Sequence, residues 1–408
     1  MSAPAIPTSF DLNAETYPFS AVEQELDRAA IFNLYCVPER GNSHSALNSS
    51  GREFRFSRSC RRFLIATQNP SASGLTAWSG AGEILATSAQ RWVMIDHNEI
   101  GRPGESPADP IRFDPSKPQR FLMVESTFSF GTGLGGFSGF GSGTTFPEMR
   151  DAEHIPVCAV GTIVRGHGPF QGLRGTYTLV GTLSAGEGFT GNVLLRVVDP
   201  RSRLRARTPL PPFTPVIPGE AGVAWLVLRG QKKNSSQKTI PTIDPAGNIT
   251  GFDVHQQLRL FDFDCALTVS DLGCRMRLRQ AIGNMTSKVV FNLAHPAGSG
   301  EDSAPIPFTA YNTYEIGLEG GSIGSFDADG QEGRTFSLRL DGLPRQTALR
   351  FGGFGRLCAG KGSFSGIRGL MTDNSVVGLA PHALTTLYVL RIEDREGRYT
   401  SSENSVWW

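Results

Sequence analysis

Glu125 is the ionisable residue whose neighbours in the sequence most favour chemistry. It lies in the apolar run Phe121–Phe128, and the alternation of side chains along a strand places it on the same face as Phe121 and Met123. A carboxylate on an apolar face loses hydration, which raises its pKa and suits it to act as a general acid or base near neutral pH. Glu125 is therefore the first predicted catalytic residue; the alternative is an outward-facing, solvated side chain.

Asp96 and His97 are the second catalytic candidates. They directly follow Arg91–Ile95, which we predict to be a strand, so they are expected near the mouth of any barrel that this strand helps to form. A carboxylate and an imidazole can share proton transfer with Glu125. The alternative for both is a polar strand end without a chemical role.

Two short motifs resemble enzyme signatures but lack the helix that their chemistry requires. Gly131–Gly136 spells G-x-G-x-x-G, yet a dinucleotide site needs a helix N-terminus for the pyrophosphate, and the glycine-rich segment Phe137–Gly143 does not begin a helix. Gly320–Gly324 spells G-x-S-x-G, but the turn-forming segment Ser325–Gly330 follows it, whereas a nucleophile elbow leads into a helix. Neither a nucleotide cofactor nor a serine nucleophile is predicted.

The cysteine and histidine patterns predict no metal site. None of the 7 histidines forms an H-x-H or H-x-x-x-H pair, and none of the 6 cysteines forms a C-x-x-C pair. We therefore expect a protein that needs no metal and no other cofactor.

Composition and charge narrow the classes of partner. The formal net charge of the 408-residue chain is +1, so the chain lacks a strong positive field to attract nucleic acid or an anionic membrane surface. No apolar run approaches the roughly 18 residues of a membrane span, and Met1–Phe10 lacks the basic and apolar regions of a secretion signal. We expect a cytoplasmic protein whose partner is a small hydrophobic ligand or substrate, with no nucleic acid and no membrane.

The segment Gly166–Gly175 recurs at Gly360–Gly369. The two segments, GHGPFQGLRG and GKGSFSGIRG, align without a gap at an offset of 194 residues, and six of their ten positions are identical. Identical residues also flank them, with one gap before the last strand: Gly161 and Gly355, Thr178 and Thr372, Arg196 and Arg391, Asp199 and Asp394. Because glycine, phenylalanine and arginine agree together, the sequence predicts two copies of one β-domain.

The elements around the repeats complete the expected organisation. A helix is predicted over Ala21–Leu34, because Ser20 and Glu23 form a capping box and Pro38 ends the pattern. Beyond it, short apolar runs alternate with Gly, Pro, Asn and Asp, as strands alternate with turns. We expect an N-terminal segment with a helix at 1–39, a first β-barrel at 40–200, a Pro-rich linker with room for an extra strand at 201–250, and a second β-barrel at 251–408.

The repeated unit, G-x-G-x-F-x-G-x-x-G entering a strand, resembles the signature strand pair of the allene oxide cyclase and dirigent barrel superfamily. The resemblance implies an all-β fold of two tandem antiparallel β-barrels, with the glycines at tight barrel corners and Phe170 and Phe364 as core plugs. Members of that superfamily are eight-stranded barrels that hold a hydrophobic substrate in the lumen, and several catalyse cyclisation without a cofactor. Their catalytic acidic and arginine residues have no match in this sequence.

Two main functions follow as expectations. The first is a cofactor-independent cyclase or isomerase that acts on a hydrophobic polyunsaturated metabolite, by a pericyclic [4+2] closure or by acid/base chemistry at Glu125. The second is a non-catalytic two-barrel protein that binds or directs such a ligand. A structural module, whose barrels are plugged by side chains, is the third.

Overall fold

The structure is a computed structural model of the whole chain. It describes residues 29–37, 43–47, 53–65, 86–95, 118, 120–130, 135–149, 154–184, 188–198, 222–232, 238–266, 275–292, 306–318, 321–339, 347–377 and 384–396. Nearly all of these residues are in antiparallel strands, and the predicted all-β class is confirmed. The helices of this part of the chain are 3-10 turns such as Gly168–Phe170, and none is long and apolar enough to cross a membrane.

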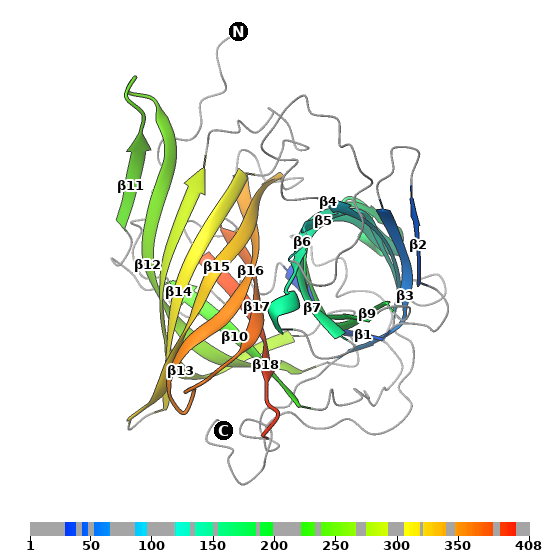
Figure 1. The fold of residues 1–408 in the computed structure, drawn as a ribbon. Coiled ribbons are helices and arrows are strands. Elements are labelled where there is room, and N and C mark those ends of the chain that lie inside the picture. The colour runs from blue at the N-terminus through cyan, green and yellow to red at the C-terminus, as the bar shows by residue number, and fades with distance from the viewer. Residues whose placement is uncertain are drawn as a thin grey trace. The chain divides into compact units, whose positions relative to one another are not determined.

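The first sheet closes on itself. Its strands are β1 (Ala29–Val37), β2 (Ser43–Leu47), β3 (Glu53–Ile65), β4 (Ala86–Ile95), β5 (Arg120–Phe130), β6 (Gly136–Thr145), β7 (His154–His167), β8 (Arg174–Ser184) and β9 (Gly188–Val198). Each strand from β3 to β9 pairs with the next, and β1 pairs with both β9 and β3. These eight strands form a closed antiparallel barrel, seen nearly end-on in Figure 1, and β2 pairs outside the ring with β3.

The second sheet repeats this strand order. Its strands are β10 (Val223–Lys232), β11 (Lys238–Ile243), β12 (Ile249–Ala266), β13 (Arg275–Asn292), β14 (Ile306–Leu318), β15 (Gly321–Arg339), β16 (Thr347–Gly362), β17 (Gly369–Val377) and β18 (Leu384–Glu393). The order β10-β18-β17-β16-β15-β14-β13-β12-β11 corresponds strand by strand to that of the first sheet. The additional pairing of β10 with β12 corresponds to that of β1 with β3. Figure 1 shows this sheet as strongly twisted.

The predicted helix is wrong where the structure describes it. Ala29–Val37 is strand β1, whose residues pair with β9 from Ala29 to Cys36 and with β3 from Leu34 to Val37. Pairing on both sides satisfies the backbone of this aromatic and β-branched segment, so tertiary context overrides the helical spacing of its apolar residues. Residues 21–28 lie outside the described part of the chain.

The two sheets begin inside the segments predicted to precede the barrels. The first sheet starts at Ala29, within the predicted N-terminal segment, and the second starts at Val223, where the predicted linker left room for an extra strand. The chain divides into two compact units, one centred on residues 29–224 and the other on 225–264 and 276–393. Strands β1 and β10 belong to the sheets because each pairs with two later strands: β1 with β3 and β9, and β10 with β12 and β18.

The repeated segments form the same turn in both sheets. In the β7–β8 turn, the Gln171 N–H donates to the Gly168 carbonyl at 3.1 Å, and in the β16–β17 turn the Ser365 N–H donates to the Gly362 carbonyl at 3.0 Å. Gly168 and Gly362 both have φ of 64°, in the left-handed region that favours glycine. The internal repeat is therefore structural, since the same hydrogen bond recurs at the offset of 194 residues.

The phenylalanine of each turn is buried as predicted. Phe170 and Phe364 are both fully buried, and each ring packs against a ring of its own sheet: Phe137 for Phe170, and Phe326 for Phe364. A Cβ atom at Gly166 would overlap the carbonyl oxygen of Phe170, and one at Gly360 would overlap that of Phe364. Only glycine lets the turn fold back this closely.

The two discounted enzyme motifs lead into strands. Gly136–Thr145, after the first motif, is strand β6, and Gly321–Arg339, which includes most of the second motif, is strand β15. Neither is followed by the helix that a dinucleotide site or a nucleophile elbow requires.

Candidate functional site

The structure places Glu125 on the outside of the first barrel. Phe121 and Met123 are fully buried, but Glu125 is exposed, and Ser126 and Phe128 take the next buried positions. The pairing of β5 with β6 shifts register between Met123 and Ser126, which marks a β-bulge. A bulge adds one residue to a strand and so reverses the alternation beyond it. The predicted interior position of Glu125 is wrong, and with it the role that depended on a desolvated carboxylate there.

The other two candidates, Asp96 and His97, lie outside the described residues, directly after the end of β4 at Ile95. Their catalytic role stays a prediction.

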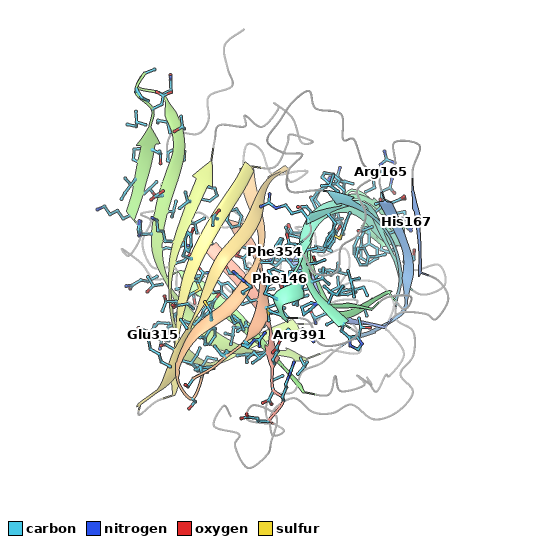
Figure 2. The ribbon with its side chains drawn as sticks, in the orientation of Figure 1. Phe146, Arg165, His167, Glu315, Phe354 and Arg391 are labelled. Atoms are coloured by element: carbon cyan, nitrogen blue, oxygen red, sulfur yellow. The ribbon has the colours of Figure 1, made fainter. Side chains whose placement is uncertain are left out.

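Aromatic side chains fill the described interior of the first barrel. The ring of Phe128 lies 5.1 Å from that of Phe137 and 5.5 Å from that of Tyr177, centroid to centroid. Phe137 continues the cluster to Phe170 at 5.5 Å. The Tyr177 hydroxyl donates to Ser126 Oγ at 2.9 Å, so the polar end of this cluster has a good partner. Figure 2 shows side chains occupying the space within this ring of strands.

Glycines make room for these large side chains. A Cβ atom at Gly161 would overlap the ring of Tyr177, and one at Gly143 would overlap the ring of Phe121. The large side chains thus lie over glycines of neighbouring strands, which is how a small barrel packs its core. Burial raises the pKa of Tyr177 well above its ordinary value, opposed by the hydrogen bond with Ser126. This tyrosine has the environment of a structural residue.

The inner face of the second sheet is more polar. Along β14 the burial alternates: Ala310, Asn312 and Tyr314 are buried, whereas Tyr311 and Glu315 are exposed. Figure 2 shows Glu315 on the outer side of this strand. The amide of Asn312 and the phenol of Tyr314 therefore lie on the inner face.

Tyr314 lies in an aromatic cluster on that face. Its ring stacks on Phe326 at 4.9 Å with an interplanar angle of 13°, and Tyr388 meets it edge-on at 5.6 Å and 90°. The ring centroid of Phe326 lies 4.8 Å from that of Phe364. The ring of Tyr314 is thus held on two sides, and its hydroxyl position is fixed by packing.

Two side chains contact the Tyr314 hydroxyl. Asn312 Nδ2 donates to its oxygen at 3.4 Å, and the hydroxyl donates to Met371 Sδ at 3.3 Å. A thioether sulfur is a weak acceptor, so the phenol proton here has a poorer partner than that of Tyr177.

Asp373 brings a carboxylate to the same face. It follows Met371 by two residues on β17, so the two side chains share a face, and it is directly paired with Tyr388 on β18. Its exposed fraction is 7%. One step further along the same pair of strands, the hydroxyls of Ser375 and Thr386 lie 2.7 Å apart.

We call this group the polar band: Asn312, Tyr314, Asp373, Ser375, Thr386 and Tyr388, all buried on β14, β17 and β18. Burial raises the pKa of Tyr314 well above its ordinary value, and nearby Tyr388 and Asp373 raise it further. Burial and Asp373 do the same to Tyr388, opposed by a hydrogen bond with Thr386. Both phenols therefore stay protonated at neutral pH and can donate hydrogen bonds. Asp373, within electrostatic range of both, can accept a proton.

Sequence reasoning missed the polar band. The signal for β14 was present, because Phe308–Ile316 alternates apolar and polar residues with Tyr314 in the apolar phase. The signal for Asp373 was the internal repeat. At the offset of 194 residues, Asp373 aligns with Leu179 of the first copy, so a carboxylate takes the position of an apolar side chain. Among the described residues, no three His, Cys, Asp or Glu side chains gather into a group that could hold a metal ion.

Comparison with known proteins adds little. No family model matches the chain, and no curated protein matches it. A solved structure from Nostoc punctiforme, a protein of unknown function from the DUF3598 family, aligns over 91% of this chain and 98% of its own at 10% identity, with a TM-score of 0.12. A likeness of that size supports no conclusion on fold or function, and the resemblance to allene oxide cyclases and dirigent proteins stays a prediction.

Proposed function

We propose that the chain is a tandem pair of β-barrels that acts as a cofactor-independent isomerase or cyclase on a hydrophobic polyunsaturated metabolite, with the interior of the second barrel as its reaction chamber. The barrel pair is supported by the matching strand orders and by the additional pairing in each sheet. An apolar chamber binds a flexible polyene in one conformer and so offsets its ordering entropy before reaction.

One observation carries the choice of chamber. The second inner face holds two phenols and a carboxylate, Tyr314, Tyr388 and Asp373, among apolar side chains. Among the side chains that the structure describes, the inner face of the first barrel carries the hydroxyls of Tyr177, Ser126 and Thr145 but no buried carboxylate. Few polar groups in apolar surroundings are the usual composition of a small-molecule site. Burying a carboxylate costs free energy, which a functional role accounts for better than packing does.

The first test is binding and turnover by the purified chain. A fluorescent conjugated polyene acid such as parinaric acid reports entry into an apolar site, and incubation with a panel of linear polyenes followed by mass analysis reports reaction. An unchanged mass with a new retention time supports the isomerase or cyclase. Recovery of intact, tightly bound polyene supports the alternative, a protein that only binds or directs its ligand, and the absence of binding contradicts both.

A matched pair of variants locates the chamber. Ala310→Leu adds bulk beside the polar band, and Ala159→Leu adds the same bulk to a buried position of β7 in the first barrel. We expect Ala310→Leu to abolish polyene binding and Ala159→Leu to leave it intact, with the melting temperature of each variant checked. Loss of binding only in Ala159→Leu would place the ligand in the first barrel and overturn the proposal.

A further inference from the structure

The donor of Tyr314 is available to a ligand. Its hydroxyl donates a hydrogen bond to the thioether sulfur of Met371, and a carbonyl oxygen is a stronger acceptor than a thioether. The buried phenol of the first barrel, Tyr177 on β8, donates instead to a hydroxyl at 2.9 Å. Exchanging the Met371 contact for a carbonyl therefore improves the hydrogen bonding of Tyr314, whereas the same exchange at Tyr177 would break a good bond.

Packing prepares Tyr314 to donate. The stack on Phe326 and the edge contact with Tyr388 hold its ring, and Asn312 donates to the phenol oxygen. A donor fixed in place before the ligand arrives needs no reorganisation when negative charge develops on the ligand.

Asp373 limits which ligands can bind. It is directly paired with Tyr388 and lies two residues after Met371, the acceptor of Tyr314, so a phosphate or a carboxylate bound at these phenols would meet a like charge. A neutral carbonyl group meets two donors and one acceptor. That set matches a carbonyl oxygen together with an acidic C–H beside it.

Small residues occur on the inner face that carries Asp373. Gly353 is directly paired with it on β16, and the buried Ala310 and Ala328 lie on the strands of Tyr314 and Phe326. Small side chains reduce the bulk on this face, and their apolar character favours a hydrocarbon chain over a sugar.

We propose that the polar band is a carbonyl site, and that the substrate class is an unsaturated ketone or aldehyde with a long apolar chain; this rests on the proposed function. The Asp373 carboxylate takes a proton from the carbon next to the carbonyl group. The electron pair of that C–H bond becomes a C=C bond, and the carbonyl π pair moves to oxygen, where Tyr314 and Tyr388 donate hydrogen bonds to it. The proton then returns from Asp373 to the γ-carbon, the C=O bond reforms, and the double bond has migrated without change in mass.

The test follows proton exchange as well as product. In D₂O, the protein is incubated with a linear polyene methyl ketone and, separately, with the alcohol and the hydrocarbon of the same chain. We expect deuterium to enter the ketone at its α-carbon, and the double bond to migrate, only in the ketone. Asp373→Asn and Tyr314→Phe should each slow the exchange on the order of 10²-fold. Tyr177→Phe removes the buried phenol hydroxyl of the first barrel and should leave the exchange rate unchanged.

Distinct outcomes overturn the inference and the proposed function. If the alcohol and the hydrocarbon rearrange as fast as the ketone, the chamber is real and the carbonyl site is wrong. Full exchange activity in folded Asp373→Asn, or none in the unaltered protein, would also overturn the carbonyl site. If no polyene of any class binds or reacts, the proposed function itself fails. Near-ultraviolet circular dichroism of each variant separates a lost group from a lost fold.

Discussion

The two sheets use one topology to build two different interiors. In the first, a chain of rings runs from Phe128 on β5 to its direct partner Phe137 on β6 and on to Phe170 in the next turn. In the second, the corresponding chain runs from Tyr314 on β14 to its direct partner Phe326 on β15 and on to Phe364. The shared turn and plug preserve the fold, while one phenylalanine of the first copy is a tyrosine in the second.

The hydroxyl groups show what this difference means. In the first barrel the buried phenol is on β8, as Tyr177, and the offset of 194 residues gives Met371 at that position in the second sheet. The phenol of the second sheet approaches from β14 and donates to that methionine. Two positions further along, Leu179 of the first copy corresponds to Asp373. The two sheets thus share a strand order, while the inner face of the second carries a buried carboxylate where the first has a leucine.

The largest expected effect comes from making the second interior like the first. Asp373→Leu introduces the side chain that Leu179 provides in the first copy, so it removes the proposed base and a buried carboxylate together. We expect turnover to fall on the order of 10²-fold or more and the melting temperature to stay the same or rise, because a leucine costs nothing to desolvate. Calorimetry with the turnover assay checks both. A folded protein with lower stability and full activity would reverse the assignment.

The next effect concerns the packing of the first barrel. Gly161→Ala places a methyl group in the ring of Tyr177, and overpacking of this kind costs about 1–3 kcal/mol of unfolding free energy. Gly247→Ala is the matched control: no atom lies within 4 Å of its added Cβ, and only its positive φ of 87° is strained. Chemical denaturation should show the larger loss in Gly161→Ala. Equal losses of unfolding free energy in the two variants would mean that the Tyr177 ring moves aside at little cost and that the first interior is loosely packed.

The features that the sequence predicted are those carried by local pattern and by repetition. The turn at Gly166–Gly175 and its copy, the buried Phe170 and Phe364 and the antiparallel strands all follow from residue types at fixed spacing. The position of Glu125 did not, because a bulge in β5 reverses the alternation and the bulge depends on pairing with β6. Strand β1 depends likewise on partners that are more than a hundred residues away, as in its pairing with β9.

The polar band was beyond sequence reasoning for a related reason. Its members come from β14, β17 and β18, and only the strand order brings Tyr314 against Tyr388. Each residue alone resembles an ordinary strand residue. Asp373 becomes a candidate base only beside the two phenols, which lie on other strands. No single segment of the sequence therefore contains the chemical pattern.

Alkaline titration tests the buried phenols of both interiors. Because burial raises the pKa of Tyr177, Tyr314 and Tyr388, the folded protein keeps protons that the unfolded chain loses above about pH 10. Their stabilisation is complete below that pH and is lost as the pH rises above it, by about 1.4 kcal/mol per residue and pH unit. Tyrosinate absorbance should therefore rise cooperatively with unfolding, and each single Phe variant should reduce the alkaline loss. Gradual ionisation of all three without unfolding would contradict their burial.

The smallest expected difference sharpens the comparison most directly, because it removes one hydroxyl from each interior. Tyr177→Phe leaves the buried Ser126 hydroxyl without its 2.9 Å donor, which costs about 1–2 kcal/mol of unfolding free energy. Tyr314→Phe removes a bond to a thioether and a 3.4 Å contact with Asn312, so its cost should be smaller, about 0.5 kcal/mol. Denaturant unfolding of the two variants side by side measures the difference, and the turnover assay should show the opposite order, with Tyr314→Phe the more damaging. A phenol that contributes more to turnover than to stability serves a ligand. If Tyr314→Phe instead destabilises the protein more than Tyr177→Phe does, and reduces turnover less, the Tyr314 hydroxyl is structural. The two interiors would then differ in packing alone.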